Sequence, residues 1–112
     1  MLTRLASRRM SSANGTKPIE VLHDMHSKMF KVLSPSGSDM AHLEYEMVHE
    51  KSRQAIDLYH TYTSPEFQGQ GLAGKLVRSA LDWAKQNNYA VIPSCSYVAS
   101  FIQKNPEWRS LL

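Results

Sequence analysis

The spacing of apolar side chains changes near residue 70. In residues 41–48 apolar and polar side chains alternate, with Glu44 and Glu46 on the polar face. Such alternation is typical of a β-strand that is buried on one side. In residues 72–85 the apolar positions recur three and four apart, which predicts an amphipathic helix. We therefore expect strands in the first part of the chain and helices in the second.

The longest predicted strand is residues 53–63. One of its faces is expected to carry Ile56, Leu58, His60 and Tyr62. Pro93 cannot donate a ladder hydrogen bond, so the last strand lies at an edge or separates from its neighbour there. The expected strands are residues 19–24, 28–34, 41–48, 53–63 and 89–96, and the expected helices are residues 72–85 and 97–105.

This element order predicts an α+β fold, an α/β sandwich. The first four strands form an antiparallel meander. The strand–loop–helix–strand unit that follows is expected to be a right-handed crossover, which places the fifth strand parallel to the fourth. A short second helix completes the domain.

The composition fits one small domain and argues against several partners. The chain has 112 residues, of which 42% are apolar, and its single cysteine excludes an internal disulfide. Arg4, Arg8 and Arg9 account for the formal charge of +3, because the other ten basic residues balance ten acidic ones. A nearly neutral folded part does not favour nucleic acid, and no apolar run reaches the about 20 residues of a membrane span. We expect a monomer.

The first residues are expected to lie outside the fold. The segment before Glu20 contains no acidic residue and is rich in arginine and serine. This composition is typical of a mitochondrial transit peptide, with cleavage expected after Met10. The alternative is a frayed terminus of a cytoplasmic protein. We therefore divide the chain into an N-terminal segment, residues 1–16, and a folded domain, residues 17–112.

One close histidine pair, His23 and His26, raises the question of a metal. Two histidines without a cysteine or a third nearby ligand are weak evidence for a metal site. We interpret both as surface positions in a hairpin and expect no metal.

Three glycines lie within six positions in the sequence FQGQGLAGKL, residues 67–76. Glycine destabilises helices and strands, so such a cluster needs a reason. The nucleotide P-loop G-x-x-x-x-G-K-[ST] is matched by Gly69, Gly74 and Lys75. That loop needs a hydroxyl as Mg²⁺ ligand at the position where this chain has Leu76, so we reject the P-loop.

A second pattern, [Q/R]-x-x-G-x-[G/A], is filled by Gln68, Gly71 and Ala73 between a strand and a helix. Successive backbone N–H groups at a helix start form a concave anion site, which the helix dipole favours. Small residues let diphosphate oxygens reach these amides, and no metal is needed. The alternative is a loop whose glycines only begin a helix.

The sequences around this loop resemble a known family. DLYHTYTSPEFQGQGLAGKLVRSALDWA, followed by VIPSCSYVASFIQKNPEW, resembles a subfamily of minimal GNAT acetyltransferases. The marks are D-L-x-H-T, the glycine loop, C-x-Y-V and K-N-P, and the resemblance covers residues 20–110. The chain departs from a full GNAT fold, because it lacks two helices after the first strand and the last two strands, which usually build the acceptor pocket.

The resemblance implies acetyl-CoA as the acyl donor. Its diphosphate is expected on the glycine loop and its pantetheine arm where the fourth and fifth strands separate. Lys75 either adds charge to this site or is a solvated helix residue. A backbone N–H near His60 to Tyr62 is expected to polarise the acetyl carbonyl. The expected cofactor-binding residues are Gln68, Gly69, Gln70, Gly71, Leu72, Ala73, Gly74 and Lys75.

Three side chains are predicted to carry the chemistry. His60 is the candidate base for an amine acceptor, with an interior histidine that orients the strand as the alternative. Cys95 either accepts the acetyl group or lines the pocket as a small hydrophobe. Tyr97 is expected to protonate the departing thiolate, as a tyrosine after the fifth strand does in many GNAT enzymes. Glu44 and Glu46 either relay protons through water or lie on a solvated sheet face.

We therefore expect an acetyltransferase that moves an acetyl group from acetyl-CoA to an amine of unknown identity. The missing acceptor-side elements motivate an alternative, a non-catalytic acetyl-CoA-binding or protein-interaction module on the same fold. Three aromatic side chains are expected to pack rather than react, namely Tyr62, Phe101 and Trp108.

Overall fold

Each predicted strand and helix has a counterpart in the computed structural model, which describes residues 19–112. The predicted N-terminal segment, residues 1–16, lies outside the described residues. Two 3₁₀ turns, η2 and η3, are additional to the prediction. The elements are β1 (Leu22–Asp24), β2 (Met29–Leu33), β3 (Asp39–Glu50), β4 (Arg53–Thr63), η2 (Pro65–Phe67), α2 (Leu72–Gln86), β5 (Ala90–Ile92), α3 (Ser96–Lys104) and η3 (Pro106–Leu111).

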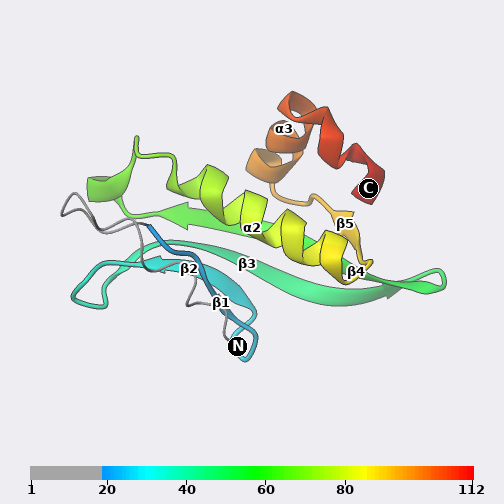
Figure 1. Ribbon diagram of the computed structural model, residues 1–112, viewed down its shortest axis with the longest axis horizontal. Coiled ribbons are helices and arrows are strands. Elements are labelled where there is room, and N and C mark those ends of the chain that lie inside the picture. Colours follow the sequence, from blue (N-terminus) through cyan, green and yellow to red (C-terminus); the bar gives the residue numbers. More distant parts are fainter. Residues whose placement is uncertain (1–18) are drawn as a thin grey trace.

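The strands form one sheet in the order β1-β2-β3-β4-β5 (Figure 1). The first three pairings are antiparallel, and β5 runs parallel to β4. The predicted α+β fold is therefore confirmed. β5 is shorter than expected and ends directly before Pro93, which cannot donate to the ladder.

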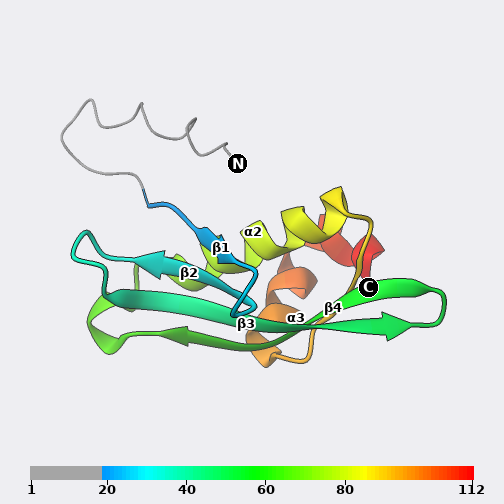
Figure 2. The same cartoon turned by 90° about the horizontal axis from the view of Figure 1, so that it is seen from below.

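The core lies between the sheet and α2, on the face of the sheet that Figure 2 shows covered by helices. The apolar stripe of α2 is fully buried there, and Trp108 and Leu111 of η3 complete the cluster. The expected packing of Trp108 is thus confirmed. Burying each large apolar side chain contributes about 1.5–3 kcal/mol, which explains why the helical stripe fixes α2 on this face. Within residues 19–112 no helix combines the length and the apolar character that a bilayer crossing requires.

The predicted end of α2 is also confirmed. Asn88 takes a positive φ of 59°, as expected for an asparagine that follows a helix. The Tyr89 N–H donates to the Ala84 carbonyl at 2.9 Å, and the Asn88 N–H donates to the Lys85 carbonyl at 3.2 Å. These bonds satisfy carbonyls that the helix end would otherwise leave without partners.

One irregularity of the sheet was not predicted. Glu44 on β3 pairs with His60, but the next residue of β3 pairs with Leu58, so Tyr59 is an extra residue on β4. Such a bulge changes which face the following side chains occupy. Leu58 is buried in the core, whereas His60 is exposed. The prediction that Leu58, His60 and Tyr62 share a face is therefore wrong. Tyr62 is 42% exposed, and its ring packs on that of His42 at a centroid distance of 5.3 Å.

Candidate functional site

The glycine loop connects η2 to α2 beyond the end of β4. Gly69 (φ 85°) and Gly71 (φ 74°) are left-handed, and Gly71 caps the start of α2. A Cβ at either position would meet no atom within 4 Å. The left-handed backbone therefore requires glycine, while the space beside both residues stays open. The Lys75 N–H donates to the Gly71 carbonyl at 3.2 Å and closes the first turn.

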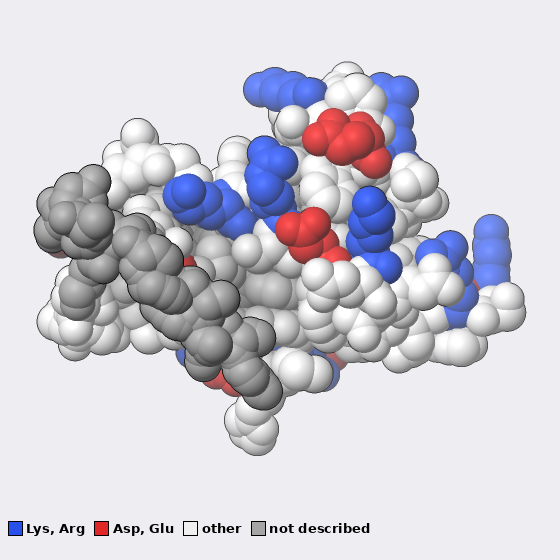
Figure 3. Space-filling view, viewed as in Figure 1, with Lys and Arg blue, Asp and Glu red and all other residues white. Residues whose placement is uncertain are grey.

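The start of α2 is suited to an anion. The first N–H groups of a helix have no partner within the helix, and the helix dipole makes this end positive. The first turn contains no acidic residue. Lys75 lies in this turn, and Arg78 lies three residues later. Figure 3 shows lysine and arginine side chains along this side of the molecule, with few acidic ones between them.

A hollow of about 210 Å³ opens beside the loop. The Gln68 side chain donates from Nε2 to the Thr63 carbonyl at 3.3 Å and so ties the loop to the end of β4. Tyr97, at the first turn of α3, is 41% exposed and forms part of the wall. The hollow is lined by Thr63, Phe67, Gln68, Gly69, Gly71, Leu72, Ala73 and Tyr97.

Five of the eight predicted loop residues thus line this hollow, namely Gln68, Gly69, Gly71, Leu72 and Ala73. Gln70, Gly74 and Lys75 are not among the lining residues. Gly74 instead faces α3, where an added Cβ would lie 3.5 Å from the Tyr97 hydroxyl oxygen.

β4 and β5 separate close to this hollow. Their ladder runs from Ala55 to Asp57, and the Cys95 N–H then donates to the Leu58 carbonyl at 2.9 Å. Beyond this contact β4 continues to Thr63 without β5 beside it. The predicted separation of the two strands after Pro93 is therefore present. The bulge at Tyr59 lies at the same point of β4.

Cys95 lies at this separation and caps α3. Its Sγ is 3.7 Å from Oγ1 of Thr61. Burial raises the pKa of the Cys95 thiol, but the Val98 N–H, the Thr61 hydroxyl and the Tyr97 N–H outweigh burial and lower the pKa below its usual value. The Val98 and Tyr97 amides belong to the first turn of α3, whose positive end favours the thiolate. Thr61 is a neighbour that the sequence reasoning missed, although it is the last residue of D-L-x-H-T.

The three predicted catalytic residues do not all meet. Cys95 and Thr61 lie on the core side of β4, whereas His60 is exposed on the opposite face beside Glu44. The alternative of an interior His60 is therefore wrong, while a role in catalysis stays a prediction. Tyr97 follows Cys95 but lies beside the glycine loop.

His23 and His26, the close histidine pair of the sequence, lie in different surroundings. His26 is exposed in the turn, as expected. His23 is half-buried, stacks on Phe30 at a centroid distance of 4.0 Å and bonds through Nε2 to the Tyr45 hydroxyl at 2.7 Å. The interpretation of His23 as a surface position is therefore wrong, because its ring fills an aromatic cluster that also contains Trp83.

Comparisons with known proteins agree with this fold. A family model described as GCN5-related N-acetyl-transferase matches residues 29–111. Protein NATD1 of Bos taurus is 33% identical over 89 residues, and protein NATD1 of Homo sapiens is 32% identical over 89 residues; each match covers 80% of this chain and 76% of the relative. The solution structure of a GCN5-like protein from Staphylococcus aureus has a TM-score of 0.64 at 25% identity, and it covers 83% of this chain and 86% of its own.

Proposed function

This chain belongs to the GCN5-related N-acetyltransferase family, and we propose that it transfers the acetyl group of acetyl-CoA to an amine. Acetyl-CoA is the donor that this family generally uses, and acetyl transfer is its general activity. The fold does not identify the amine, because the elements that usually build the acceptor pocket have no counterpart within residues 19–112.

One observation carries the proposal: the open glycine loop follows the end of β4, where β4 pairs with β3 on one edge but no longer with β5 on the other. The helix start offers amides and positive charge to the diphosphate, without a metal. The free edge of β4 offers backbone groups to the amide groups of the pantetheine arm, in the way that a further strand would bind. A donor held at both places has its thioester near Thr61 and Cys95.

The transfer then needs a neutral amine beside the thioester. The amine nitrogen attacks the carbonyl carbon, a C–N bond forms and the C–S bond breaks, and the proton that the nitrogen loses ends on the CoA thiolate. Backbone N–H groups at the bulge polarise the carbonyl oxygen. The amine loses its proton to water, because His60 lies on the face of β4 opposite to Cys95 and is not beside the thioester. Tyr97 supplies the proton to the thiolate.

Cys95 offers a second route to the same products. Its lowered thiol pKa favours the thiolate, which is the nucleophilic form. The thiolate attacks the thioester, releases CoA as the thiolate leaving group and carries the acetyl group as a new thioester, which the amine then attacks.

A second candidate function is a non-catalytic acetyl-CoA-binding module. The observation that favours it is the position of His60 on the face of β4 opposite to Cys95. Both functions require the donor site, so donor binding and turnover need separate experiments.

Gly71→Glu tests the donor site. The new carboxylate stands at the start of α2, where it repels the diphosphate and occupies its space, so calorimetry should detect no CoA binding. Gly37→Glu is the matched control, because Gly37 also has a positive φ (92°) and open space around it, in a turn far along the chain from the loop. Equal affinity of the two folded variants would contradict the assignment, and a strict Mg²⁺ requirement would return the P-loop to consideration.

Mass spectrometry tests the transfer. The full chain is incubated with acetyl-CoA alone and with amines, polyamines and histone peptides. A mass increase of the acceptor supports the transferase. Acetylation of Cys95 without an acceptor supports the covalent route. CoA binding without either product supports the non-catalytic module.

A further inference from the structure

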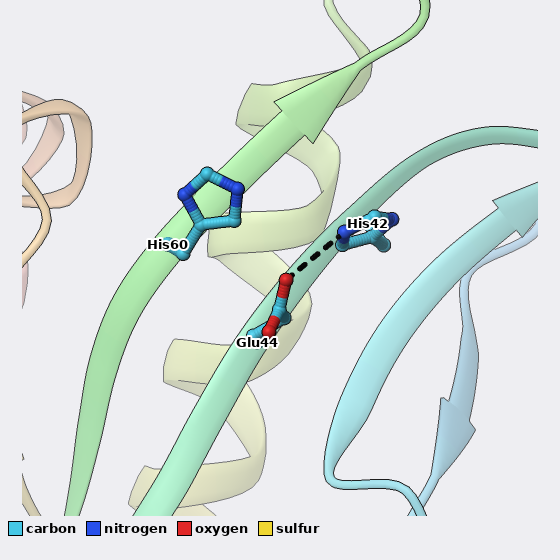
Figure 4. A group of neighbouring side chains, drawn as sticks. All are labelled: His42, Glu44 and His60. Atoms are coloured by element: carbon cyan, nitrogen blue, oxygen red, sulfur yellow. Dashed lines mark hydrogen bonds and ion pairs between the residues drawn. The ribbon is translucent and has the colours of Figure 1, made fainter.

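On one face of the sheet no helix of residues 19–112 packs (Figure 2), and this face carries a group of three metal-ligand side chains. His42 and Glu44 lie two residues apart on β3, so they share a face, and His60 is the cross-strand partner of Glu44 on β4. One ligand atom from each of the three lies within 4.8 Å of the other two. Figure 4 shows the three side chains on two neighbouring strands, with α2 behind the sheet. We propose that His42, Glu44 and His60 bind a divalent transition-metal ion of the Zn²⁺ type.

The spacing of two ligands already fits such an ion. His42 Nε2 is 3.2 Å from Glu44 Oε2. Two ligand atoms on a tetrahedral ion, at bond lengths of about 2.0–2.1 Å, are about 3.3 Å apart. His60 is exposed, so rotation of its side chain brings a ring nitrogen to the third position without moving the core. The fourth position faces solvent and takes water.

The two ligands on β3, His42 and Glu44, are each oriented by a hydrogen bond to another side chain. His42 Nδ1 lies 2.8 Å from the Asp39 carboxylate, which is the arrangement that directs Nε2 of a metal-bound histidine toward the ion. The Tyr59 hydroxyl donates to Glu44 Oε1 at 3.3 Å and leaves Oε2 for the metal. The bulge at Tyr59 therefore serves this site twice, since it also places His60 on the same face.

The contacts of His42 fit a proton or a metal ion between its Nε2 and Glu44. A neutral imidazole donates from one nitrogen only. When Nδ1 donates to Asp39, Nε2 directs its lone pair at a carboxylate oxygen of Glu44, which is unfavourable unless a proton or a metal ion lies between them. The side chains of His42 and Glu44 are 17% and 27% exposed, so solvent screens this contact only in part.

The experiment uses the full chain after removal of metals with a chelator. Zn²⁺ is titrated by calorimetry, and Co²⁺ is added in parallel because its visible absorption reports tetrahedral coordination. We expect one ion per chain and shifts of the His42 and His60 ring resonances in NMR spectra. His42→Gln and His60→Gln should each lower the affinity about tenfold or more, and Asp39→Asn should lower it by about 10- to 100-fold.

His49→Gln is the matched control, since His49 lies on the same strand outside the group and contacts Gln54. This variant and Cys95→Ala should bind Zn²⁺ like the parent. The proposal is overturned if the parent binds no Zn²⁺, if both histidine variants of the group bind it unchanged, or if Cys95→Ala abolishes binding. Since the ligands join β3 and β4, Zn²⁺ should also raise the melting temperature of the parent but not that of His60→Gln.

Discussion

Gly71, which caps α2, and Gly74, in the first turn of that helix, are expected to respond to alanine in opposite directions. Gly71 has φ 74° and ψ 19°, and an added Cβ meets no atom within 4 Å, so Gly71→Ala costs only backbone strain. The left-handed conformation disfavours an L residue by roughly 1–2 kcal/mol. Gly74 is helical, and its added Cβ would lie 3.5 Å from Tyr97 Oη and 3.8 Å from Phe101 Cε2, which are ordinary contacts. Gly74→Ala therefore gains the helix preference of alanine, about 0.5–1 kcal/mol.

The two variants should differ by about 2 kcal/mol in free energy of unfolding, with Gly74→Ala the more stable. Urea unfolding followed by tryptophan fluorescence measures this difference, because both tryptophans pack in or against the core. With a denaturant slope of about 1–3 kcal/mol/M, the midpoints separate by roughly 1 M. Gly71→Asn should recover part of the loss, since asparagine tolerates the left-handed region. Equal destabilisation by both alanine variants would refute the placement of the α2 start.

Three further predictions concern other parts of the chain. Burial lowers the pKa of His23 in the folded state. As pH falls below about 6.5, the unfolded state therefore gains a proton before the folded state does, and the parent loses stability. The difference in free energy of unfolding between the parent and His23→Gln should narrow from pH 7 to pH 5 in urea titrations. Thr61→Val removes a hydroxyl that lowers the pKa of Cys95, so alkylation of the thiol by iodoacetamide at pH 7 should slow. Residues 1–10 fused to a fluorescent protein should direct it to mitochondria, and replacement of their arginines by glutamate should prevent this.

Each of these has a clear contrary result. A stability difference that stays constant between pH 7 and pH 5 would show that His23 titrates alike in both states. Unchanged alkylation in folded Thr61→Val would remove the hydroxyl from the causes of the lowered pKa. A diffuse signal from the unmodified fusion would contradict mitochondrial targeting and favour a solvated terminus.

The sequence predicted those features of the fold that depend on runs of neighbouring residues. The alternation of β3, the stripe of α2 and the glycines before that helix are all local patterns, and the structure confirms them. The bulge at Tyr59 was missed because it is a mismatch between two strands, and no run on β4 alone records it. The same residue decides which face His60 occupies. The sequence therefore predicted the glycine loop. It did not predict that His60 and Cys95 lie on opposite faces, or that His60 lies beside Glu44 of β3.

The free end of β4 has a consequence for the unliganded chain. The outer strands β1 and β5 are only three residues long, and short edges resist pairing with other molecules. Residues 59–63 of β4 are different, because β5 no longer runs beside them and they form an edge of the sheet themselves. An extended segment of a second molecule could pair with this edge in the way proposed above for the pantetheine arm. If the donor binds as proposed, it covers the edge, and chains without donor should associate more readily than chains with it.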